Sequence, residues 1–215
     1  MQHTMGLAKS FARRILGSHH QFHTISRPCD VFINHRGIDT KKQISGLLHD
    51  RLSGMGLTPF LDCRSMKPGD KLFDKIDAAI RDCKVGVAVF SPRYCDSYFC
   101  LYELALLVES KKRVVPIFCD VKPSQLRLED NGTCPEKELQ RFGRALEEAA
   151  KNTVGLTFDS LRGDWSEFLM SASDAIAKNL LEVDEERLGK SLIPPMFQHS
   201  SFLIADKVNR EIARC

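Results

Sequence analysis

The sequence has little that would mark a membrane, nucleic-acid or nucleoside-triphosphate protein. Its apolar runs fall well short of the ~18 residues that a transmembrane helix needs. The formal net charge over 215 residues is only +3, which gives no bulk argument for binding nucleic acid. The motifs G-x-G-x-x-G, G-x-x-x-x-G-K-S/T, G-x-S-x-G and H-E-x-x-H are all absent. Dinucleotide-binding Rossmann enzymes, P-loop proteins, α/β-hydrolases and zinc proteases are therefore not indicated.

The eight cysteines are not spaced like a metal site. No pair forms C-x-x-C, and no histidine stands at zinc-finger spacing from a cysteine, so we expect no metal. Cys29, Cys83 and Cys119 fall in or beside segments expected to be buried, where a free thiol behaves as a small hydrophobic side chain. A reducing compartment is the simplest interpretation. We expect a cytoplasmic location, with the nucleus or an organelle as alternatives.

The positive charge is concentrated at the N-terminus. Residues 1–28 carry four Lys or Arg, no acid and four of the seven histidines. A disordered basic tail is the favoured interpretation, and a transit peptide or a basic amphipathic helix on an anionic membrane are the alternatives. We therefore expect a tail at 1–27, a folded domain at 28–181, and a C-terminal extension at 182–215.

Apolar periodicity alternates between strands and helices along the domain. The run 85–90 is apolar without alternation, which indicates a strand covered on both faces and hence a parallel sheet. With right-handed crossovers the pattern predicts an α/β fold, a flavodoxin-like doubly wound sheet of four to five parallel strands flanked by helices. We expect strands at 29–34, 57–61, 85–90, 114–119 and, least clearly, 153–158, and helices at 40–53, 72–83, 98–110, 136–152 and from Trp165.

Two local expectations concern the helix at 40–53. Thr40 with Gln43 three residues on has the spacing of a capping box, so Thr40 is the expected N-cap. Ile44, Leu47, Leu48, Leu52 and Met55 are expected to share its apolar face.

The first strand and the helix at 98–110 point to a site. The first strand ends in a turn at Arg36-Gly37, and open α/β sheets bind ligands at the carboxyl ends of their strands. Glu103 shares a helical stripe with Phe99 and Cys100, so partial desolvation should raise the pKa of its carboxyl. The alternative places Glu103 at the edge of the stripe, facing water or a lysine. The loop 62–71 is long for a strand–helix connection and is either functional or simply solvated.

Motifs along the whole domain resemble Toll/interleukin-receptor (TIR) domains, specifically the plant type. The resemblance covers about residues 28–180, and together the motifs are highly specific. The matching stretches are Asp30-Val31-Phe32-Ile33-Asn34, Arg36-Gly37, Asp39-Thr40, Phe60-Leu61-Asp62, Val87-Ala88-Val89-Phe90-Ser91, Tyr94, Ser97, Cys100-Leu101, Glu103-Leu104, Val115-Pro116-Ile117-Phe118, Asp120-Val121 and Pro123-Ser124.

The resemblance implies a five-stranded fold and, as in many plant members, an NAD+ nucleosidase that acts in immune and cell-death signalling. NAD+ would be the substrate rather than a cofactor, with nicotinamide and either ADP-ribose or a cyclic ADP-ribose as products. By resemblance, the site residues are Glu103 as the catalytic group, Arg36 and Gly37 at the pocket mouth, Phe99 as the aromatic contact, Ser97 and Cys100 at the helix start, and Lys71 in the substrate-closing loop 62–71.

The resemblance also implies partners. Two subunits would complete each site through TIR–TIR contacts, other TIR proteins are further candidates, and the products would be read by downstream immune receptor complexes. A non-catalytic TIR adaptor and a nucleic-acid-dependent cyclic nucleotide synthetase are the alternative functions.

The sequence departs from the family pattern at three places. The family usually has Trp at Phe99 and often Phe at His35, and its Ser-His self-association motif falls on Gly46-Leu47. No nucleotide-binding or leucine-rich-repeat region follows, so we expect a TIR-only protein.

Overall fold

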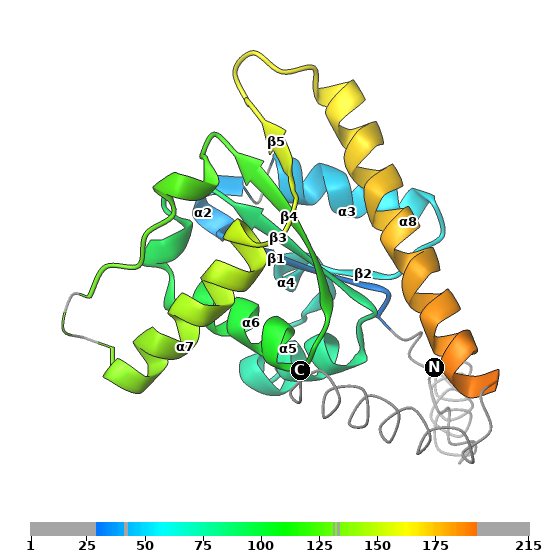
Figure 1. Cartoon of the computed structure of the whole chain (residues 1–215). Helices are drawn as coiled ribbons and strands as arrows, with labels where there is room; N and C mark the ends of the chain where they lie inside the picture. The colour runs from blue at the N-terminus through cyan, green and yellow to red at the C-terminus, as the bar shows by residue number, and fades with distance from the viewer. Residues whose placement is uncertain (1–28, 41–42, 131, 133, 193–215) are drawn as a thin grey trace, which may run out of the picture.

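The computed structural model describes residues 29–192 except 41–42, 131 and 133 (Figure 1). The expected tail at 1–27 and most of the expected extension lie outside the described residues. Among the helices of the described part, none combines the length and apolar character needed to cross a membrane.

A parallel sheet of five strands forms the centre of the domain, in the order β2-β1-β3-β4-β5 (Figure 1). This is the flavodoxin-like order, so the predicted fold class is confirmed, including the fifth strand. β2 is shorter than expected because only two of its residues pair with β1. The strands are β1 Val31–His35, β2 Pro59–Phe60, β3 Val85–Phe90, β4 Arg113–Cys119 and β5 Leu156–Phe158.

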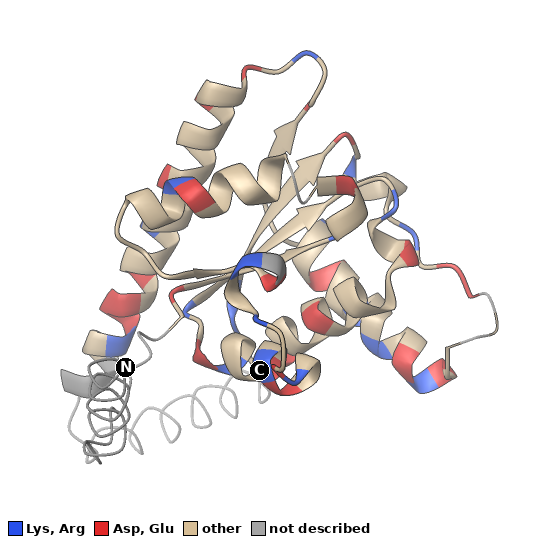
Figure 2. Ribbon diagram, turned by 180° about the vertical axis from the view of Figure 1, so that it is seen from behind, with Lys and Arg blue, Asp and Glu red and all other residues tan. Residues whose placement is uncertain are grey.

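Helices cover both faces of the sheet. α3 and α8 pack on one face, and α5, α6 and α7 pack on the other (Figure 1). Charged residues lie mostly on these helices and their loops, while the sheet is largely free of charge (Figure 2). The helices are α2 Gly37–Thr40, α3 Ile44–Gly54, α4 Asp62–Ser65, α5 Leu72–Asp82, α6 Tyr98–Glu109, α7 Glu136–Leu146 and α8 Trp165–Leu192, with single turns at η1 Tyr94–Asp96 and η2 Pro123–Gln125 and a π-helical segment at η3 Glu147–Lys151.

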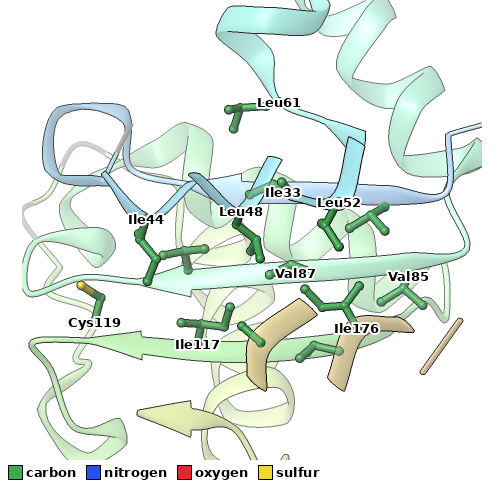
Figure 3. Packing of buried hydrophobic residues seen from close by; sticks show 14 of the residues in the cluster. Ile33, Ile44, Leu48, Leu52, Leu61, Val85, Val87, Ile117, Cys119 and Ile176 are labelled. Atoms are coloured by element: carbon green, nitrogen blue, oxygen red, sulfur yellow. The ribbon is translucent and has the colours of Figure 1, made fainter. Parts of the chain in front are cut away.

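The apolar run of β3 is explained by its two covered faces. Val85 and Val87 contribute to the core beneath α3 and α8, together with Ile33 and Ile176 (Figure 3). Alternate residues, such as Phe90, contribute to the core beneath α6 and α7. Both sets are apolar because neither face meets water.

The start of the predicted helix at 40–53 is wrong. The chain instead forms the short helix α2 and then begins α3 at Ile44, after Gln43, which makes no side-chain capping bond. Thr40 is not an N-cap, because its hydroxyl donates backward to the carbonyl of Arg36 (3.1 Å).

The predicted apolar face of α3 is also wrong in two positions. Leu47 and Met55 are 43% and 45% exposed, whereas Ile44, Leu48 and Leu52 are fully buried. These three residues follow one another at intervals of four, which places them on the same face of α3, and that face packs on the sheet.

The helix α8 continues through the boundary expected after residue 181. Lys84 at the start of β3 donates to Asp184 (2.9 Å), and Arg113 at the start of β4 pairs with both Glu182 and Glu186 (2.6 Å to Glu186). The expected boundary therefore falls inside a helix that is attached to the sheet on both sides of residue 181.

Candidate active site

The carboxyl end of β1 and the first turns of α6 meet at the candidate site. Asn34 and His35 end β1 and are buried. Ser97 is the N-cap of α6, with its hydroxyl accepting the backbone N–H of Cys100 (3.3 Å). The cap fixes where α6 starts and therefore which side chains its first turns present to β1. Glu103 is one of them.

Glu103 is held by the side chain of Asn34. The Asn34 Nδ2 donates to Glu103 Oε2 (2.8 Å) and to the carbonyl of Cys100 (3.2 Å). Desolvation by burial raises the pKa of Glu103 from 4.5 to about 8; the hydrogen bond from Asn34 opposes this shift, and the charge of Asp62 adds to it. The predicted direction of the pKa shift is confirmed, and the hydrogen-bond partner is an amide rather than a lysine.

Arg36 is fixed at the end of β1 by several groups. It donates to the carbonyl of Arg93, and its guanidinium lies 3.7 Å from Asp39 and 3.4 Å from Asp96. Burial acts to raise the pKa of Asp39, but hydrogen bonds from Arg93 and Ser91 outweigh it and hold the pKa below its usual value. Gly37 begins α2 directly after Arg36. Arg36 and Arg93 are thus balanced by the carboxylates of Asp39 and Asp96 at the place where the sequence predicted the pocket mouth.

Phe99 lies one turn before Glu103 and is half exposed. Its ring contacts Phe73 of α5 (centroids 5.8 Å apart) and Tyr98 (6.1 Å), and Phe73 also meets Tyr102 edge-on (5.8 Å). Leu72 and Phe73, at the start of α5, are both more than two-fifths exposed. Together these rings form an accessible aromatic surface beside Glu103.

The remaining predicted residues occupy different positions. Cys100 is buried, its thiol contacts the carbonyl of His35 (3.3 Å), and burial raises its pKa to about 12, so it stays a neutral thiol. Lys71 precedes α5, is highly exposed and pairs with Asp74 (3.9 Å). The structure thus brings Ser97, Cys100 and Glu103 together, while Lys71 is at the far end of the loop that begins at Asp62.

A family model described as TIR domain matches residues 31–146, which is more than half of the chain. The matched span includes Asn34, Arg36 and Glu103. The chain belongs to the TIR domain family.

Relatives of this TIR protein include plant proteins of two sizes. The probable 2′ cyclic ADP-D-ribose synthase BdTIR of Brachypodium distachyon is 49% identical over 168 residues, which are 76% of this chain and 75% of that protein. The TMV resistance protein N of Nicotiana glutinosa is 33% identical over 123 residues, which are 55% of this chain but only 10% of that protein. The TIR domains of the activated Roq1 resistosome superpose with a TM-score of 0.60 at 30% identity, covering 69% of this chain and 99% of that one. The plant TIR resemblance is confirmed.

Sequence reasoning gave no site role to three residues around Glu103 in this TIR domain. Asn34 donates a hydrogen bond to Glu103, and the fully buried Tyr94 donates one to Asn34. The buried His35 lies 3.9 Å from Asp62 at the start of α4. One signal could have indicated Asn34: it is a polar residue inside a strand whose other residues before His35 are all apolar.

A large hollow of about 960 Å³ lies at the opposite edge of the sheet, where β3 and β4 begin. Its lining includes six cationic and three acidic side chains, and three of the cations, Lys84, Lys112 and Arg113, have structural roles. Lys112, for example, donates to the carbonyls of Arg81 and Cys83 at the end of α5. Cations are favoured at such helix ends, so the position of Lys112 needs no ligand to explain it.

Proposed function

We propose that this TIR protein cleaves NAD+ at the bond between nicotinamide and ribose, with Glu103 as the catalytic group. The observation that carries the proposal is the desolvated carboxyl of Glu103, held by Asn34 at the carboxyl edge of the sheet. Ligands of open α/β sheets bind at this edge. The likeness to a protein named as a 2′ cyclic ADP-D-ribose synthase favours a cyclic ADP-ribose as one product.

The chemistry requires one carboxylate rather than two. Nicotinamide in NAD+ is already cationic, so it leaves without receiving a proton. The ribosyl group becomes oxocarbenium-like, as in glycoside cleavage, and a nearby carboxylate stabilises that positive charge. The ribose bond breaks with its electron pair going to the nicotinamide nitrogen. Water then gives ADP-ribose, or a hydroxyl of the same molecule gives a cyclic product.

The charge of the substrate also sets the protonation of Glu103. With a pKa of about 8, Glu103 is mostly protonated in the free protein at neutral pH. A pyridinium ring bound beside it favours the ionised form and lowers that pKa, because an opposite charge within a few ångströms stabilises the carboxylate. Binding of NAD+ thereby generates the base form that the reaction uses.

The neighbouring residues fit the other parts of the substrate. The exposed ring of Phe99 offers a stacking face, and the guanidinium of Arg36, held beside Gly37 by Asp39 and Asp96, offers hydrogen-bond donors at the mouth. Ser97 and Cys100 line the start of α6, and Lys71 with its loop closes over the site. We propose that the loop of a second subunit completes the closure, so that activity depends on self-association, as supported by the likeness to TIR domains of a resistosome.

The setting proposed for this activity is plant immune signalling in a reducing compartment. The described residues include six free cysteines, which supports a cytoplasmic location. The relatives include a TMV resistance protein, which supports a role in defence.

The direct test is release of nicotinamide from NAD+ by the purified protein. Wild type, Glu103→Gln and Glu148→Gln are compared, since Glu148 is an exposed glutamate on η3 and serves as the matched control. We expect Glu103→Gln to lose about 10²–10³ in rate, the usual effect of removing one electrostatic stabiliser, and Glu148→Gln to lose none. Binding to other TIR domains without any nicotinamide release would instead indicate an adaptor.

A further inference from the structure

A chain of hydrogen bonds links three residues that are far apart in the sequence. The Tyr94 hydroxyl donates to Asn34 Oδ1, and Asn34 Nδ2 donates to Glu103 Oε2 (2.8 Å). Both the Asn34 amide and the Tyr94 hydroxyl also contact the carbonyl of Cys100, each at 3.2 Å. Tyr94 belongs to η1, Asn34 to β1 and Glu103 to α6.

The orientation of the Asn34 amide follows from its surroundings. The carbonyl of Cys100 can only accept a hydrogen bond, so the group of Asn34 that faces it is the NH₂. The same NH₂ faces Glu103 Oε2, which therefore accepts whether the carboxyl is ionised or protonated. The amide oxygen is left for Tyr94, whose hydroxyl donates to it.

Burial separates Asn34 and Tyr94 from the substrate. Asn34 and Tyr94 are fully buried, so neither side chain reaches a ligand. A buried amide is costly unless its hydrogen bonds are made, and here both the oxygen and the NH₂ of Asn34 are used. Asn34 and Tyr94 thus act on the site only through Glu103 and Cys100.

We propose that Asn34 and Tyr94 are positioning residues that fix the carboxyl of Glu103 and reserve its Oε1 atom for the substrate. Oε2 accepts from the amide, so the proton of the neutral carboxyl falls on Oε1, and Oε1 is the oxygen that this hydrogen bond leaves for the ribose. Tyr94 acts one step back, by preventing the amide of Asn34 from turning. The inference rests on the proposed function, because it assigns an orientation to the group that function uses.

Two variants and their combination test this arrangement. Tyr94→Phe removes one hydroxyl and keeps the ring, and Asn34→Ala removes the amide. We expect Asn34→Ala to lower kcat by about 10²-fold and Tyr94→Phe by about tenfold, because a misplaced catalytic group is costly. KM should change by less than about twofold, since neither residue touches the substrate. Because Tyr94 acts through Asn34, the double variant should be no slower than Asn34→Ala.

A readout independent of turnover is the titration of the Glu103 carboxyl, followed by carbon NMR and assigned with Glu103→Gln. Asn34→Ala removes the NH₂ that stabilises the ionised form, and Tyr94→Phe lets the amide turn away from Oε2, so the midpoint should rise in both single variants. Ser173→Ala is the control for loss of a buried polar group, because Ser173 is equally buried but contacts Arg51 and the backbone of α8.

The outcomes separate the inference from the proposed function. A raised midpoint together with a lower kcat supports the inference. A lower kcat with an unchanged midpoint overturns it, because a merely structural loss behaves in that way, and so does an additive double variant. If wild type releases no nicotinamide, the proposed function fails and the midpoint alone decides whether Asn34 holds Glu103. If Asn34→Ala does not fold, Tyr94→Phe gives the decision.

Discussion

The raised pKa of Glu103 predicts that this glutamate destabilises the fold at neutral pH. Its pKa is 4.5 under ordinary conditions and about 8 in the folded protein. Between these values the folded state binds more protons than the unfolded state. The free energy of unfolding therefore falls as pH rises from about 4.5 and stops falling near pH 8. The sign is opposite to that of a carboxylate in an ion pair.

The size of the effect follows from the two pKa values. Linkage gives a penalty of about 1 kcal/mol at pH 5 and about 3 kcal/mol at pH 7, so this one group accounts for roughly 2 kcal/mol of pH dependence between them. Glu103→Gln has no such term. The amide oxygen of a glutamine can still accept from Asn34, as Oε2 does at 2.8 Å.

Urea unfolding of wild type and Glu103→Gln, measured across this pH range, provides the assay. We expect the variant to gain stability relative to wild type by roughly 2 kcal/mol as pH rises from 5 to 7. Any fixed cost of the substitution cancels in that comparison, and other titrating groups are common to both proteins. Glu148→Gln, at an exposed position, should show no such trend. A stability difference that stays constant with pH would mean that Glu103 titrates as an ordinary carboxyl, and the argument for its desolvation would fail.

Four further outcomes are expected. The value of kcat/KM for NAD+ should rise with pH up to about 8, because it reports the protonation of the free enzyme; a flat profile would exclude Glu103 as the group that must ionise. Nicotinamide release should increase more than linearly with protein concentration, and strict linearity with a monomeric sedimentation profile would exclude a shared site. Leu48→Ala should cost about 2–5 kcal/mol in urea unfolding, while Leu47→Ala at its half-exposed position should cost less than about 1 kcal/mol. Truncation after residue 181 should lower the melting temperature, since it removes Asp184, one of the two acidic partners of Lys84, and both acidic partners of Arg113; an unchanged melting temperature would mean that those ion pairs contribute nothing.

The sheet could be predicted because its signal is local. The run at 85–90 is apolar throughout, and the structure places its alternate residues in cores on opposite faces. The same reasoning found α6 and the fifth strand to within a few residues. Turn positions were less accessible, because the hydroxyl of Thr40 could bond forward to α3 or back to Arg36, and only tertiary packing decides between them.

The candidate site was predictable in part for a similar reason. The sequence of α6 alone places Glu103 on an apolar stripe, and that placement predicts the direction of its pKa shift. The hydrogen-bond partner of Glu103 could not be predicted in this way, because Asn34 lies 69 residues earlier, on a strand that meets α6 only in the folded domain. No spacing rule relates two residues so far apart. Polar residues inside otherwise apolar strands are the signal that would have marked Asn34 for attention.

The stability argument and the functional argument meet at Glu103. A glutamine would satisfy Asn34 equally well and would avoid the cost of a desolvated carboxyl near neutral pH. Packing and hydrogen bonding therefore do not explain why a glutamate stands there. Groups that destabilise their own fold are concentrated at functional sites, because the reaction there needs a property of the group that makes the folded state less stable. Under the proposed function, that property of Glu103 is ionisation in the presence of a cation, which is the condition that a bound pyridinium ring would create.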